Sequence, residues 1–250
     1  MNVGMMWRST GPVTRNLIII NFLLFAVEIL FPGFCGTLIA KLGLHLVGAS
    51  DFNPIQLVTY MFLHDNKTFL HILFNMFSLW MFGRILEQTW GSKRYFVFYM
   101  VCGIGAAVVQ EAVWLLTWKH EYIAGIAPLN GLTYQHMADI VNQAVANHDS
   151  DFLNAMAQMR NQFVTIGASG AVFGLLLGFA MTFPNMPLYL FFIPVPIKAK
   201  YMVIGYAVLE FFLGVNGGGT IAHFAHLGGM LFGLFILLYW KKKGMLHGGF

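Results

Sequence analysis

Charged residues are scarce in this chain. Asp, Glu, Lys and Arg make up 10% of its 250 residues, whereas hydrophobic residues make up 58%. A soluble domain usually carries about 25% charged residues, and one with so few would leave large apolar patches exposed to water. The composition therefore excludes an ordinary soluble domain and indicates a protein whose exterior contacts lipid.

The chain has only two cysteines. Cys35 falls in an expected outer loop and Cys102 in an expected membrane span, so the sequence contains no disulfide framework and no cysteine-based metal site. It also lacks the HExxH motif of zinc proteases. The net charge is +4, but its basic residues are dispersed at the ends of apolar runs rather than gathered in a nucleic-acid-binding patch. We therefore expect no cofactor, no metal and no nucleic-acid partner.

Long apolar runs dominate what is present. A membrane-spanning helix needs about 20 mainly apolar residues, and six runs approach that length. They cover Leu17–Phe31, Phe69–Leu86, Tyr95–Trp118, Gly167–Phe183, Met202–Val215 and Ala222–Trp240. We expect the first run to be a retained span rather than a cleaved signal peptide, and the short fifth run to gain a turn from Lys198, Lys200 and Tyr201. The chain is thus predicted to be an all-α polytopic membrane protein.

The distribution of Lys and Arg between the connecting segments predicts the orientation of the chain in the membrane. With a cytoplasmic N-terminus, ten of the fourteen fall on the cytoplasmic side and four outside, which favours cytoplasmic N- and C-termini. We expect a short cytoplasmic N-terminus at residues 1–15, a six-helix core at 16–240 and a short basic cytoplasmic tail at 241–250. The expected location is a cell membrane, such as the bacterial inner membrane.

Two expected outer segments are long. Pro32–Thr68 is fairly apolar and is predicted to lie in the membrane interface. Residues 119–162 form the most polar stretch, yet apolar residues recur at helical spacing around Val141 and again around Met156. This pattern predicts one or two amphipathic helices. We interpret this outer-face insertion as a surface cap without catalytic residues.

Four polar side chains within the apolar runs should share one depth. Such side chains are costly in a bilayer and are functional candidates by default. His71, Asn75, Ser169 and His226 all lie early in runs that are predicted to pass from the outside inwards. Topology alone therefore places them in one layer near the outer face.

Ser169 begins the fourth run between Gly167 and Gly170. Glycines permit a tight turn and close approach of other groups, while the free N–H groups and positive dipole end of a helix N-terminus suit a developing oxyanion. Small residues then recur every four positions in two of the runs, at Gly170, Gly174 and Gly178 and at Ala225, Gly229 and Gly233. If these faces pack together, Ser169 and His226 come within hydrogen-bonding reach.

Simpler interpretations exist for each signal. A serine in a membrane helix usually bonds back to the carbonyl four residues earlier, and small-residue stripes usually serve packing. From the residues alone, His223 is as good a base as His226.

The alternative from another class of function is a metal-ion or proton transporter. Its ligands would come from His71, His223, His226, Glu28, Glu111 and Glu210.

The motifs resemble those of the rhomboid intramembrane proteases, in the family's order, from about Gln56 to Trp240. The matching stretches are Thr59-Tyr60-Met61-Phe62-Leu63-His64, His71-Ile72-Leu73-Phe74-Asn75, Gly167-Ala168-Ser169-Gly170 and Ala225-His226-Leu227-Gly228-Gly229. The resemblance implies a six-transmembrane-helix rhomboid-like bundle. It also implies a serine endopeptidase that cleaves membrane-anchored substrates within or near their transmembrane segments, with the active site open to the outer face.

The resemblance also implies roles for individual residues. Ser169 would be the nucleophile and His226, which precedes a small-residue pair as the family's base does, the general base. His71 and Asn75 would line the oxyanion hole with the Ser169 backbone N–H, and Phe173 would stack on the base. Gly167 and Gly170 would support the serine. The family's Ser–His dyad needs no Asp, which suits a chain with no carboxylate beside either motif.

Two departures from the family pattern stand out. Many members carry a Trp-Arg pair in the first outer loop, where this chain reads Ile55-Gln56-Leu57-Val58-Thr59, and the segment 119–162 is longer than the corresponding loop of the minimal core.

The remaining ionisable residues of the spans receive structural interpretations. Glu28, Glu111 and Glu210 are interpreted as capping or pairing between helices, and His223 as a cavity-rim or packing residue. An inactive relative that escorts membrane proteins would be expected to have lost the serine or the histidine.

Overall fold

The computed structural model describes residues 7, 9–190, 193–216 and 223–245. Part of the predicted N-terminal segment, the predicted start of the sixth span at Ala222 and the end of the basic tail lie outside the described residues. Helices dominate the described chain, and two small two-stranded sheets accompany them.

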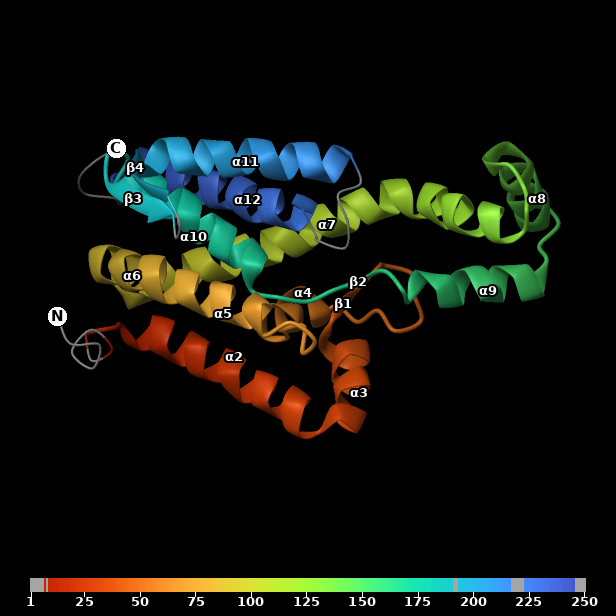
Figure 1. Cartoon of the computed structure of the whole chain (residues 1–250), viewed down its shortest axis with the longest axis horizontal. Helices are drawn as coiled ribbons and strands as arrows, with labels where there is room; N and C mark the ends of the chain where they lie inside the picture. The colour runs from red at the N-terminus through yellow and green to blue at the C-terminus, as the bar shows by residue number, and fades with distance from the viewer. Residues whose placement is uncertain (1–6, 8, 191–192, 217–222, 246–250) are drawn as a thin grey trace.

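The helices of the bundle run roughly along one direction (Figure 1). They are α2 (Pro12–Leu30), α5 (Phe69–Ser78), α6 (Arg84–Trp90), α7 (Ser92–Leu129), α10 (Ser169–Thr182), α11 (Ala199–Val215) and α12 (His223–Lys242). A π-helical turn, η2 (Leu79–Gly83), joins α5 and α6 into one rod. Four helices of the described chain are long and apolar enough to cross a membrane: Pro12–Leu30, Phe69–Trp90, Ser92–Leu129 and His223–Lys242. The chain is therefore a membrane protein.

Large apolar side chains cover the exterior of the bundle. Leu23, Leu30, Phe212 and Phe235 are each more than half exposed although they lie on apolar helices. A water-soluble protein rarely exposes so much apolar surface, whereas lipid tails accommodate it. The outward-facing residues thus agree with the composition.

The α10 and α12 backbones touch, as the small-residue stripes predict. A Cβ on Gly229 would collide with the carbonyl oxygen of Gly170, and one on Gly174 would stand 3.0 Å from the carbonyl oxygen of Gly229. Gly178 is different, because its open side faces Trp90 and Phe98 instead of α12. The predicted stripe on α10 therefore serves two interfaces, and the part nearest Ser169 holds α12.

Helix α7 continues well beyond the predicted end of the third span. Its 38 residues reach Leu129 rather than Trp118, which gives a length of about 57 Å at 1.5 Å per residue. Beyond Trp118, α7 packs with α8 (Tyr134–Ala146) and α9 (Ser150–Arg160) around a small apolar cluster of its own. Residues 119–162, called the outer arm below after the orientation predicted for them, project from the end of the bundle (Figure 1). One or two amphipathic helices were predicted here, and the structure has two, α8 and α9.

Gln56 organises the first outer loop. This loop contains α3 (Pro32–Leu42), β1 (Leu44–His45), α4 (Gln56–Thr59) and the 3-10 turn η1 (Tyr60–Phe62). The buried Gln56 oxygen accepts hydrogen bonds from the backbone N–H groups of His45 and Asn53. Its nitrogen donates to the carbonyl oxygens of Ala40, Lys41 and Asp51. A single amide thus ties the loop together where many family members carry Trp-Arg.

A hairpin connects α10 to α11. Strands β3 (Pro187–Leu190) and β4 (Ile193–Lys198) pair antiparallel. Helix α11 begins at Ala199, three residues before the predicted start at Met202. The extra turn predicted from the residues around Lys200 is therefore present.

Candidate active site

Ser169 is positioned by the strand that leads into it. Strand β2 (Val164–Thr165) pairs with β1 of the outer loop, and the Gly167 N–H donates to the carbonyl oxygen of Tyr60 at 2.9 Å. Gly167 has a φ of 127°, a conformation that side chains larger than hydrogen rarely adopt. The chain then turns directly into α10, whose first residue is Ser169. The half-buried serine therefore lies at a helix N-terminus, as the sequence predicts.

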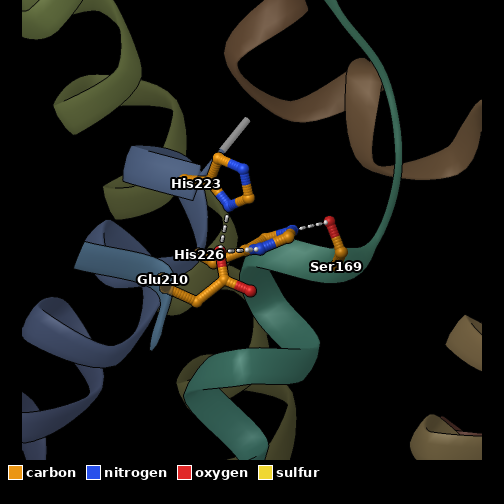
Figure 2. A network of polar contacts seen from close by, with 4 residues as sticks. All are labelled: Ser169, Glu210, His223 and His226. Atoms are coloured by element: carbon orange, nitrogen blue, oxygen red, sulfur yellow. Dashed lines mark hydrogen bonds and ion pairs between the residues drawn. The ribbon is translucent and has the colours of Figure 1, made fainter. Parts of the chain in front are cut away.

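His226 reaches this serine from α12. Its Nε2 lies 2.7 Å from Ser169 Oγ, and its ring stacks on Phe173 with centroids 4.2 Å apart and an angle of 5° between the planes. The close approach of α10 and α12 makes this contact possible. Figure 2 shows the hydroxyl directed at the imidazole. An unprotonated Nε2 in this position can accept the serine proton.

A carboxylate stands on the other side of the same imidazole. Glu210 Oε2 of α11 lies 3.0 Å from His226 Nδ1, within ion-pair distance. The same oxygen lies 2.6 Å from Nδ1 of His223, which donates a hydrogen bond to it. Figure 2 shows Glu210 below both rings. The expectation that no carboxylate accompanies the Ser–His pair is thus wrong in space although it is true along the sequence.

Sequence reasoning underestimated Glu210 and His223. Glu210 was expected to cap or pair between helices, and it does join α11 to α12, but it does so at His226, the histidine that contacts Ser169. His223 is buried against Glu210, which agrees with the predicted packing role and not with the alternative position at a cavity rim. The available signal was an ionisable residue inside an apolar helix, which marks a functional candidate by default.

His71 lies beside Gly167, two residues before Ser169. Its Nε2 lies 3.0 Å from the point where a Cβ on Gly167 would stand. The Asp65 backbone N–H donates to His71 Nδ1 at 3.3 Å, so Nδ1 is an acceptor and the proton of the neutral ring resides on Nε2. That N–H faces the segment that carries Ser169.

Asn75 lies one turn further along α5 and is buried. Its Nδ2 donates to the carbonyl oxygen of His71 at 2.9 Å, which leaves the second amide hydrogen for another acceptor. Among the described residues, no hydrogen bond joins Asn75 to the Ser169 segment. The structure thus brings His71 next to the segment that leads into Ser169 and places Asn75 one turn further along α5, bonded to the His71 carbonyl oxygen.

The Glu210–His223–His226 cluster has the composition of a metal site. One donor atom from each residue lies within 4.8 Å of the other two. Ligands of tetrahedral Zn²⁺, at about 2.0–2.1 Å from the metal, stand about 3.3 Å apart. The observed separations of 2.6 and 3.0 Å are shorter and fit shared protons. The cluster as folded is therefore suited to hydrogen bonding.

The other two glutamates of the membrane helices, Glu111 and Glu28, lie outside the Ser169 site. Glu111 of α7 accepts a hydrogen bond from the Val47 N–H at 2.8 Å and so holds the loop after β1, instead of capping a helix or pairing between helices as predicted. Glu28 of α2 is buried, and no hydrogen bond to its carboxylate occurs among the described residues. Neither carboxylate joins the Ser169 site.

Comparison with known proteins identifies the family. The Rhomboid domain family model matches residues 51–243. The chain is also similar to Rhomboid protein 1, mitochondrial, of Saccharomyces cerevisiae, with 25% identity over 190 residues, which cover 76% of this chain and 43% of that relative. Because that relative is mitochondrial, the comparison gives no support to the expected bacterial inner membrane. This chain belongs to the rhomboid family, whose members are usually intramembrane serine proteases.

Proposed function

We propose that the chain is an intramembrane serine endopeptidase that cleaves membrane-anchored proteins within or near their transmembrane segments. The observation that carries this proposal is the 2.7 Å contact between Ser169 Oγ and His226 Nε2, on a ring held flat against Phe173. A nucleophile and a base within hydrogen-bonding reach are the minimum that acyl transfer requires. Membership of the rhomboid family supports the same reaction.

The reaction would proceed in two steps. Ser169 Oγ attacks the scissile carbonyl carbon while its proton passes to His226 Nε2, and the tetrahedral intermediate collapses as that proton passes to the leaving amine. The C–N bond breaks and an acyl-serine ester remains. A water molecule, deprotonated by His226, then attacks the ester carbon. The ester C–O bond breaks, the proton returns from His226 to Ser169 Oγ, and the second product leaves as a carboxylic acid.

Three donors are proposed to stabilise the negative oxygen of the intermediate. The N–H of Ser169 lies at the start of α10, where backbone N–H groups have no partner within the helix. His71 Nε2–H faces Gly167, and Asn75 contributes its second amide hydrogen. Loss of one such donor typically lowers kcat by about 10²–10³. We expect His71→Ala to lower kcat by this amount, with a smaller effect on KM.

The proposed topology places this site where water and a membrane substrate can both reach it. We propose six spans formed by α2, the α5–α6 rod, α7, α10, α11 and α12, with both termini cytoplasmic and the outer arm on the opposite side. In Figure 1 the first helix starts and the last helix ends at the same end of the bundle, opposite the outer arm. Helix α10 has 14 residues and measures about 21 Å, less than the hydrocarbon thickness of about 30 Å. Ser169 would therefore lie below the outer surface, in a cavity open to that side.

The test uses the purified protein and a membrane-anchored test substrate. Wild type, Ser169→Ala and the control Ser78→Ala, which alters another half-buried serine of a membrane helix, are incubated with and without EDTA. Wild type and Ser78→Ala should cleave the substrate and react with a fluorophosphonate, whereas Ser169→Ala should do neither. EDTA should have no effect. Cleavage that persists in Ser169→Ala, or that EDTA abolishes, would refute the proposal.

The choice of base has its own test. His226 touches the serine, whereas His223 touches Glu210. His226→Ala should abolish fluorophosphonate labelling of Ser169, and His223→Ala should leave measurable labelling. A labelled His226→Ala protein beside an unlabelled His223→Ala protein would reverse the assignment.

A further inference from the structure

We propose that Glu210 is a positioning residue for the base, so that the working unit of this protease is Ser169–His226–Glu210, with His223 holding the carboxylate. This inference rests on the proposed function. Its structural basis is the placement of one carboxylate oxygen against Nδ1 of both histidines, from a helix that contributes nothing else to the dyad.

The first role of Glu210 is to fix the tautomer of His226. The ring can accept the Ser169 proton at Nε2 only if its own proton is on Nδ1. That Nδ1 is buried, and no side-chain or backbone acceptor in the described chain makes a well-aligned hydrogen bond to it. Glu210 Oε2, at 3.0 Å, lies within ion-pair distance of it. A carboxylate at this point favours the tautomer that catalysis needs, as the third member of a serine-protease triad does.

The second role is to stabilise charge that exists only during the reaction. When His226 takes the serine proton it becomes a cation, and the nearby carboxylate then faces an opposite charge in a buried site where such attraction is strong. An interaction that strengthens on the way to the transition state raises kcat rather than substrate affinity. The contact is imperfectly aligned in the resting site, and catalytic hydrogen bonds of this kind often tighten only with substrate bound.

His223 explains how the carboxylate is held at this position. A buried carboxylate is costly unless it accepts hydrogen bonds, and the His223 Nδ1–H supplies a short one of 2.6 Å. His223 and His226 lie three residues apart on α12, so both rings reach the same oxygen from one face of the helix. Glu210 can therefore stay buried beside the base before any substrate arrives.

A purely structural role makes a different prediction. If Glu210 only pins α11 to α12, its replacement lowers thermal stability, and activity falls in proportion to the folded fraction. Glu210→Gln separates the two roles, because the amide oxygen can still accept from His223 while the negative charge is lost. Glu111→Gln is the matched control, since Glu111 is also a buried membrane carboxylate that accepts one hydrogen bond but lies away from the serine.

The kinetic experiment measures kcat, KM and melting temperature for these variants and for Glu210→Asp. We expect Glu210→Gln to lower kcat by about 10- to 1,000-fold, below the loss of about 10⁴ known for the corresponding change in a serine-protease triad. KM should change by less than about threefold and the melting temperature should stay near the wild-type value. Glu210→Asp should recover part of kcat, and Glu111→Gln should keep all of it. An unchanged kcat in Glu210→Gln, or the same loss in Glu111→Gln, would overturn the proposal.

A spectroscopic measurement tests the tautomer of His226 independently of proteolysis. Long-range ¹H–¹⁵N correlation spectra of histidine-labelled protein report which ring nitrogen carries the proton, and His226→Asn assigns the signal. We expect the Nδ1–H tautomer for His226 in wild type and a mixture with the Nε2–H form in Glu210→Gln. The Nε2–H form in wild type would overturn the role of Glu210. Absence of cleavage and of fluorophosphonate labelling in wild type would instead count against the proposed function.

Discussion

The contact between Gly229 and Gly170 gives a prediction whose size follows from the packing. Gly229→Ala places a methyl group against the Gly170 carbonyl, far inside the 3.4 Å of ordinary van der Waals contact. The obstacle is backbone, which cannot rotate aside as a side chain can, so α10 and α12 must separate. We estimate a shift on the order of 1 Å, comparable with other overpacked cores.

This shift acts on stability and on catalysis by different amounts. Overpacking typically costs about 1–3 kcal/mol, while replacing a helical glycine by alanine returns up to about 1 kcal/mol. With the full return, the free energy of unfolding should therefore fall by about 0–2 kcal/mol. The same displacement moves His226 away from Ser169, and a misplacement of about 1 Å in a catalytic contact lowers the rate by about 10². That loss of rate corresponds to about 2.7 kcal/mol of activation free energy, so it should exceed the loss of stability.

The assay compares cleavage rate and thermal unfolding in detergent for Gly229→Ala and a control. Gly205→Ala is the control, because Gly205 also lies in a membrane helix but has nothing within 4 Å of the added methyl group. It should match wild type in cleavage rate and be as stable or up to about 1 kcal/mol more stable. If Gly229→Ala also matches wild type, the close α10–α12 contact does not position the dyad and the reasoning is refuted.

Three further predictions concern the surroundings of the site. Gln56→Leu leaves five backbone groups of the outer loop without their partner and should lower the free energy of unfolding by at least about 2 kcal/mol in a denaturant titration. Phe173→Leu removes the ring stacked on His226 and should lower kcat by about 3- to 10-fold, the equivalent of an aromatic pair. Burial, with a smaller effect of neighbouring His71, lowers the pKa of His64 from 6.5 to about 3. Stability should therefore fall as the pH drops from about 6.5 towards 3, because the unfolded chain binds the proton first, and His64→Phe should flatten that decline in melting temperature.

Each of these has a clear contrary result. A free energy of unfolding within about 0.5 kcal/mol of wild type in Gln56→Leu would show that water replaces the lost hydrogen bonds. An unchanged kcat in Phe173→Leu would make the stacked ring dispensable. The same pH dependence of melting in His64→Phe and wild type would assign acid sensitivity to other groups.

The meeting of Ser169 and His226 was predictable because local patterns encode it. Gly167 marks the turn before α10, and small residues at every fourth position on two helices indicate which faces can touch. Equal depth then follows from counting spans. These signals lie within each helix and need no knowledge of how the helices are arranged.

Glu210 and Gln56 were harder to interpret because their roles depend on that arrangement. Glu210 lies on α11, and nothing in its neighbourhood along the chain says which side chain of α12 it meets. Gln56 stands where the family pattern changes, and its role appears only when the loop closes around it. The end of α7 was predicted too early, because its helix continues past the apolar run into the outer arm. Hydropathy locates the membrane part of a helix rather than the end of the helix.

Because α10 is short, the thickness of the surrounding bilayer determines how far Ser169 lies below the membrane surface. A helix that falls short of the hydrocarbon thickness is accommodated by local thinning of the bilayer, at a cost of fractions of a kcal/mol per Å. Lipids with longer acyl chains raise the membrane surface above Ser169, and shorter chains lower it. If the chain cleaves membrane-anchored substrates as proposed, the peptide bond that reaches the serine would shift along the substrate helix as lipid composition changes. One protease and one substrate would then yield different cleavage products in thick and thin membranes.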